Sequence, residues 1–144
     1  VAGLLLTILV PLLLRKRSGS DEIERLVPKG WGNFFETVPS GAGAYFLKHI
    51  LHDWGDRDCA KILATCRSAM GDDARLLICE RIVPPGNEVS AAKIIDLHML
   101  MTNHGGKERT EKEFLALLSG SGFRLERIIP TGTAWSLIEA ARVD

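Results

Sequence analysis

The sequence predicts an α/β fold, with a sheet of at least four strands, helices on both faces and an antiparallel hairpin at the C-terminal end. Short apolar runs at 44–51 and 76–79 flank a stretch of helical periodicity, a pattern typical of parallel strands joined by a crossover helix. The apolar runs 123–129 and 134–141 are separated by only four residues, so they should be antiparallel neighbours. With 46% hydrophobic and 25% charged residues among 144, the chain can bury a core.

The first helix is expected between the strands 44–51 and 76–79. Asp56 can act as its N-cap, Asp58 favours its positive N-terminal end, and Gly71 should end it. Its apolar positions repeat at helical spacing and are Cys59, Ile62, Leu63, Cys66 and Met70. Strand, helix and strand together predict a right-handed parallel crossover.

Two further helices are expected before the hairpin. Residues 91–101 have apolar positions suited to a helix, and Thr110 and Glu113 have the spacing of a capping box that would start the next one. Gly120 and Gly122 should end that helix. Its apolar face would consist of Phe114, Leu115, Leu117 and Leu118.

Charge and cysteine content exclude several classes of partner. The 18 basic and 18 acidic residues balance, so nucleic acid and anionic membrane have no electrostatic basis as main partners. Cys59, Cys66 and Cys79 form neither a disulfide framework nor a C-x-x-C zinc motif. We therefore expect three packed thiols in a reducing compartment, the cytoplasm, and no metal site.

The segment Val1–Leu14 is uncharged and almost entirely aliphatic, and it is followed by Arg15-Lys16-Arg17. It is shorter than the ~20 residues that cross a bilayer, and it contains Pro11. A buried strand and helix start is the simpler interpretation. A membrane anchor is the alternative.

Polar residues stand where ligands bind in open α/β sheets, beyond the carboxyl ends of the strands. His52 and Asp53 follow the first strand, Glu80 ends the second, and Glu108 precedes the capped helix. An imidazole beside carboxylates is the arrangement of a base whose tautomer is held by an acid. On placement alone, a packing or capping histidine and solvated glutamates remain the alternative.

Four stretches of the chain, in order and spacing, point to a known family. They are FFETVP at 34–39, LKHILHDW at 47–54, IIDLHML at 94–100 and GGKERT at 105–110. Together they resemble the S-adenosylmethionine-dependent O-methyltransferases of the caffeate, isoflavone and hydroxyindole type and their bacterial relatives. The similarity extends from about residue 32 to residue 141. It implies part of a Rossmann-like class I methyltransferase sheet.

The resemblance also implies a reaction and a site. Methyl transfer from S-adenosylmethionine to a hydroxyl of a small aromatic or polyketide-like acceptor would use His52 as general base, with Glu80 and Glu108 orienting it. The residues that match cofactor-binding positions are Asn33, Phe34 and Lys48, and those that match acceptor-binding positions are Asp96, Met99 and Asn103. Trp54 is expected to pack in the core.

The expected chemistry agrees with these roles. A phenol has a pKa of about 10, so little of it is nucleophilic phenolate at neutral pH, whereas a histidine near 6.5 is largely available as a base. The methyl group of a sulfonium is already activated, so positioning and proton removal are what the protein must supply. This scheme requires no metal.

Two parts of the family pattern have no counterpart in the sequence. These are the glycine-rich turn of the cofactor site and the N-terminal helical domain through which members form homodimers. We expect residues 1–36 to be a degenerate or truncated part of the cofactor-binding half, and residues 37–144 to be the C-terminal part of the catalytic domain. A non-catalytic remnant that binds small ligands or pairs with a full-length homologue is the alternative function.

Overall fold

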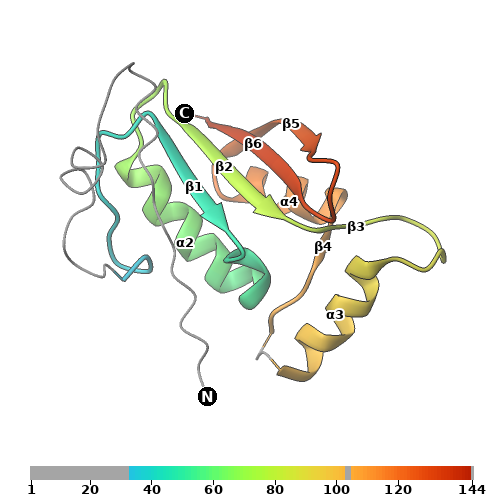
Figure 1. Ribbon diagram of the computed structural model, residues 1–144. Coiled ribbons are helices and arrows are strands. Elements are labelled where there is room, and N and C mark those ends of the chain that lie inside the picture. The colour runs from blue at the N-terminus through green and yellow to red at the C-terminus, as the bar shows by residue number, and fades with distance from the viewer. Residues whose placement is uncertain (1–32, 103–104, 144) are drawn as a thin grey trace, which may run out of the picture.

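The computed structural model describes residues 33–102 and 105–143, and their main feature is a mixed four-stranded sheet (Figure 1). In spatial order the strands are β1 (Ala44–Lys48), β2 (Arg75–Glu80), β6 (Ser136–Arg142) and β5 (Phe123–Pro130). β1 and β2 are parallel, and β6 runs antiparallel to both β2 and β5. The predicted α/β fold and its C-terminal antiparallel hairpin are confirmed.

The core lies between the sheet and the helices α2 (Asp56–Ala69) and α4 (Glu111–Gly120), which contact each other. Alternate residues of the strands face these helices, as the two-residue period of a strand requires. Fully buried members of this core include Leu47, Leu76, Ile78, Ile138, Ile62, Leu63, Phe114 and Leu118. Among the described residues, α2 and α4 pack on the same face of the four-stranded sheet. The sequence also predicts helices on the second face, and the described part of the chain has none there.

A short second pairing brings a distant segment to the carboxyl end of β2. β3 (Ile82–Val83) follows β2 after one residue and pairs in parallel with β4 (Arg109–Thr110), with Ile82 opposite Arg109. The helix α3 (Ala91–Thr102) lies between them in sequence and stands away from the sheet in Figure 1. This pairing places Glu108, directly before β4, close to Glu80 at the end of β2.

The first strand is shorter than the sequence predicts. β1 ends at Lys48 rather than residue 51, because His49 adopts a positive φ of 55° that breaks the extended backbone. A 3-10 turn, η1 (Leu51–Asp53), follows. The early end of the strand lets His52 project from a tight turn at the edge of the sheet.

Three details of the helices and thiols also differ from expectation. Gly55, not Asp56, is the N-cap of α2, and the Asp56 carboxylate instead accepts hydrogen bonds from Arg109. Leu115 lies on the outer side of α4 and is 51% exposed, whereas the other three predicted apolar positions of that helix are buried. Cys59 and Cys66 are buried as predicted, but Cys79 is only half-buried because it lies on the less covered face of β2.

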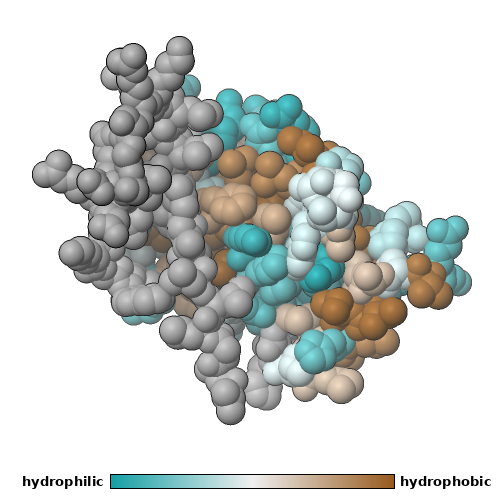
Figure 2. Space-filling model, in the orientation of Figure 1, coloured by the Kyte–Doolittle hydropathy of each residue, from teal (hydrophilic) through white to brown (hydrophobic). Residues whose placement is uncertain are grey.

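The helix α3 carries an exposed apolar face, which is visible as a brown patch in Figure 2. Its exposed residues are Ile94, Leu97, Leu100 and Met101. No helix within 33–102 or 105–143 is long and apolar enough to cross a membrane. The two interpretations of Val1–Leu14 concern residues outside the described ranges.

Candidate active site

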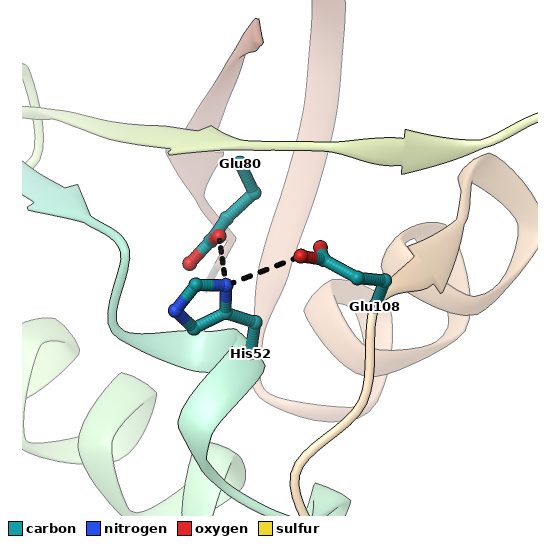
Figure 3. A group of neighbouring side chains, drawn as sticks. All are labelled: His52, Glu80 and Glu108. Carbon is teal, nitrogen blue, oxygen red and sulfur yellow. Dashed lines mark hydrogen bonds and ion pairs between the residues drawn. The ribbon is translucent and has the colours of Figure 1, made fainter. Parts of the chain in front are cut away.

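The imidazole of His52 lies between two buried carboxylates (Figure 3). Its Nδ1 is 3.4 Å from Oε2 of Glu80 and 3.3 Å from Oε1 of Glu108. The His52 side chain is 13% exposed, and the two glutamates are almost fully buried. The three residues come from η1, the end of β2 and the segment before β4, so the predicted grouping is present in the structure.

Glu80 also determines the shape of the turn that carries His52. Its Oε1 accepts hydrogen bonds from the backbone N–H groups of Ile50 and Leu51, at 2.9 and 3.0 Å. These two residues directly precede the histidine. One carboxylate therefore anchors the turn through one oxygen and faces the imidazole through the other.

Besides its contact with His52, Glu108 is held by two further residues. Its backbone N–H donates to Oδ1 of Asp96 on α3 at 2.8 Å, and its Oε1 lies 3.6 Å from Nη1 of Arg81. Arg81 in turn places its guanidinium 3.6 Å from the ring centroid of Trp135, on which His49 also stacks. The acid next to His52 thus has a defined position rather than a solvated one.

The charges around His52 favour a proton on its Nδ1, with the N–H directed at the two glutamates. Burial alone would lower the pKa of His52, but the hydrogen bond to Glu108 and the charges of Glu80 and Asp53 raise it above its ordinary value. Burial raises the pKa of Glu80 to about 7, against the opposing charge of His52. With Nδ1–H directed at carboxylates, the Nε2 lone pair is the basic site, and it lies 3.5 Å from Oδ1 of Asp53.

The same donor set is also compatible with a metal ion. Ligand atoms of His52, Glu80 and Glu108 all lie within 4.8 Å of one another. A metal would need the Nδ1 lone pair, whereas a base acting through Nε2 needs a proton on Nδ1. The two roles therefore exclude each other, and a metal-free site stays a prediction.

Two of the predicted cofactor residues, Asn33 and Phe34, lie on the surface near the start of α2. Phe34 is half-buried and contacts Phe35 and Trp54, with ring centroids 4.9 and 6.2 Å away. The amide of Asn33 is engaged locally, because it donates to Glu36 and accepts from the backbone of Phe35. Trp54 is half-buried and packed against the core as predicted.

Lys48 and the predicted acceptor residues have different settings. Lys48 is exposed at the end of β1, three residues before η1. Asp96 contacts the site through the backbone of Glu108, and Met99 is buried on α3. Asn103 lies outside the described residues.

The structure adds one residue to the site that the sequence analysis quoted only as part of a motif. Arg109 is 1% exposed, and its guanidinium donates to backbone and side-chain acceptors around η1. Its position in the GGKERT stretch was the available signal. Nothing in the sequence distinguishes this buried arginine from the exposed ones, because its shortest hydrogen bonds are to residues more than 50 positions away.

Comparison with known proteins gives a consistent result. The model of a family described as the O-methyltransferase domain matches residues 16–124. The chain is 45% identical over 109 residues to phenazine O-methyltransferase PhzM of Lysobacter antibioticus, covering 76% of this chain and 32% of the relative. It is 49% identical over 117 residues to the O-demethylpuromycin-O-methyltransferase of Streptomyces alboniger, covering 78% and 31%.

A solved structure agrees with these relatives. The O-methyltransferase NcsB1 from neocarzinostatin biosynthesis, in complex with S-adenosylmethionine and 2-hydroxy-5-methyl naphthoic acid, matches with a TM-score of 0.73. The identity is 31%, over 85% of this chain and 35% of that one. The chain thus spans about a third of the length of the proteins it matches.

Proposed function

The chain belongs to the O-methyltransferase domain family, and from this premise we propose that it carries the proton-removing site for methyl transfer to a small acceptor. The methyl donor would be S-adenosylmethionine, and the acceptor would be a hydroxyl of an aromatic or polyketide-like compound. The observation that carries the proposal is His52, with Nδ1 facing two buried carboxylates. In this proposal residues 37–144 form the C-terminal part of the catalytic domain, and residues 1–36 belong to the cofactor-binding half.

His52 acts as the general base through Nε2. The acceptor oxygen forms its bond to the methyl carbon while the carbon–sulfur bond of the donor breaks, and the hydroxyl proton passes to Nε2. Glu80 and Glu108 orient the ring through Nδ1–H and stabilise the imidazolium that results. An acid–base contribution of this kind is typically worth about 10²–10⁴ in rate.

The described residues fit part of a cofactor site. The half-buried ring of Phe34 can stack on an adenine, and the exposed ammonium of Lys48 can reach a ligand. The Asn33 carbonyl already accepts one hydrogen bond and has one lone pair left for an amino group. When bound, S-adenosylmethionine supplies an electrophilic methyl group on a positively charged sulfur.

The acceptor would lie beside α3. Met99 supplies a buried apolar contact, and Asp96 fixes the backbone of Glu108. Asn103 would add a polar contact. This mixture of groups suits a small ring that carries hydroxyl or carboxyl substituents.

Cofactor binding is the first test. Titration of the full 144-residue chain with S-adenosylmethionine in a calorimeter should give a saturable heat. No heat at millimolar concentration would overturn autonomous catalysis and favour the non-catalytic remnant. Phe34→Ala should weaken the binding, whereas Phe46→Ala on β1 serves as an aromatic control away from the proposed adenine contact.

Proton removal is the second test. Transfer of a radiolabelled methyl group to caffeic acid or a hydroxynaphthoic acid should fall about 10²–10⁴-fold in His52→Gln. The binding heat of the cofactor should stay unchanged. His98→Gln, an exposed histidine on α3, is the matched control. Full transfer by His52→Gln would eliminate the proposed base, and loss of transfer with a chelator would replace it with a metal site.

A further inference from the structure

Arg109 is a buried cation whose shortest hydrogen bonds lead to the segment around His52. Its Nη1 donates to the carbonyl of Leu51 at 2.8 Å, and its Nη2 donates to the carbonyl of Trp54 at 2.9 Å. These two carbonyls bracket His52 and Asp53 in the chain. Nε and Nη2 both donate to Oδ1 of Asp56, at 3.0 and 2.7 Å. The guanidinium therefore clamps both ends of the turn that carries the histidine.

The backbone of Arg109 connects this clamp to the acid. Glu108 directly precedes it, and Arg109 is paired with Ile82 in the short β3–β4 ladder that continues from the end of β2. The side chain of Arg109 points to the turn of His52, while that of Glu108 lies 3.3 Å from the imidazole. One residue thus links the element of the base to the element of the acid.

We propose that Arg109 is a positioning residue, which sets the distance between His52 and Glu108 by joining the turn 51–54 to the segment before β4. The inference rests on the proposed function in one respect: the distance between His52 and Glu108 matters for catalysis because His52 is the proposed base. Arg109 touches neither acceptor nor cofactor in this scheme. Its effect on the chemistry passes through the orientation of the base.

The geometry requires arginine rather than lysine. Three nitrogens in a rigid plane reach acceptors from three directions, two of them backbone carbonyls. A lysine ammonium is a single point on a flexible stem and cannot bridge the same set. Asp56 compensates the buried charge, which would otherwise be costly.

The charged groups around His52 define what a measurement of its titration reports. From η1 itself Asp53 faces the ring, from β2 Glu80, and from the segment before β4 Glu108. His49 lies beside the ring, with the ring centroids 5.7 Å apart, and Arg81 forms an ion pair with Glu108. Only the Glu108 contact depends directly on the clamp, because Asp53 and Glu80 are tied to the turn by the chain and by backbone hydrogen bonds.

The test is a double-mutant cycle read out by NMR titration of His52 in the full chain, with the resonance assigned by its loss in His52→Gln. Glu108→Gln should lower the pKa of His52, since it removes a charge and a hydrogen-bond acceptor. In an Arg109→Lys background the same change should lower it by roughly half as much or less. A simple loss of stability would not alter this coupling.

Arg57→Lys is the matched control, because Arg57 is exposed on the first turn of α2. In that background Glu108→Gln should have its full effect. An equal effect in folded Arg109→Lys would overturn the proposal. If circular dichroism shows that Arg109→Lys does not fold, Asp56→Asn, which keeps the arginine but removes its carboxylate partner, takes its place in the cycle and decides by the same criterion.

The readout is independent of methyl transfer. It needs neither S-adenosylmethionine nor an acceptor, so the clamp can be confirmed in a chain that proves inactive. Conversely, suppose that the chain transfers methyl groups and that Glu108→Gln shifts the pKa of His52 equally with and without Arg109→Lys. That result would retain His52 as the base and overturn only the positioning role of Arg109.

Discussion

The buried carboxyl of Glu80 has a structural and a chemical task at once. One oxygen accepts two backbone N–H groups that shape the turn before His52, and the other faces the imidazole. Burial raises its pKa to about 7, so the site exchanges a proton in the neutral range. A group with both tasks couples the stability of the fold to the protonation of the site.

The unfolding free energy should therefore decrease as the pH rises. The folded pKa of Glu80, about 7, lies above its ordinary 4.5, so its contribution is complete below 4.5 and is lost as the pH rises through 7. His52, whose pKa is also raised, contributes with the same sign at higher pH. Urea unfolding between pH 5 and 8 should show a decline of at most ~1.4 kcal/mol per pH unit for each proton.

Glu80→Gln isolates this effect, because its amide oxygen can still accept from the turn but the group no longer titrates. The variant should show a flatter pH profile than the parent chain. Glu88→Gln, an exposed position, should leave the profile as it is. Equal slopes in all three proteins would contradict the assignment to Glu80.

At the scale of elements, α4 shows how local sequence defines a helix. Thr110 Oγ1 accepts from the backbone N–H of Glu113, and the Glu113 carboxylate accepts from the backbone N–H of Thr110, which confirms the predicted capping box. The N-cap therefore directly follows Arg109 and the helix starts at Glu111, which keeps the active-site segment short. Beyond its other end, Gly122 has a φ of 78°, and its carbonyl accepts from Nε of Arg67 on α2.

Gly122→Ala should be strongly destabilising. Its positive φ is disfavoured for alanine, and an added Cβ would lie 2.6 Å from Nε of Arg67. We expect a loss of about 1–3 kcal/mol in the free energy of unfolding, measured in urea. Gly120→Ala is the control, since a Cβ there meets no atom within 4 Å, and it should raise stability by up to about 1 kcal/mol. Similar losses in both variants would refute the argument.

At the scale of the molecule, one packed face holds the described fold together. All four strands, including β5 through Phe123, contribute buried side chains to the core shared with α2 and α4 in the described ranges. Leu118 is fully buried in this core, while Leu115 on the same helix is half exposed. The site lies at the carboxyl ends of the parallel strands β1 and β2, so its geometry depends on this core.

Leu118→Ala should lower the free energy of unfolding by about 2–5 kcal/mol, because it leaves a cavity in a packed interior. Leu115→Ala should change it by less than about 0.5 kcal/mol. Thermal and urea unfolding of both variants would measure the difference. Equal effects would mean that Leu115 is covered in solution, as the sequence pattern first suggested.

The family, the longer strands, the helices and the grouping of His52 with Glu80 and Glu108 could be predicted from the sequence, whereas the short β3–β4 pairing and the turn η1 could not. The elements follow from periodicity and from the capping box, and the shared edge of His52 and Glu80 follows from the rule that parallel strands bring their carboxyl ends together. The family, and the role of Glu108 beside His52, follow from the resemblance of the four motifs. Tertiary structure decided the rest: the early break at His49, the glycine N-cap of α2, the outward position of Leu115 and the buried clamp of Arg109. Each depends on contacts between segments far apart in the chain, and local sequence encodes the preference of a residue but not the partner it meets.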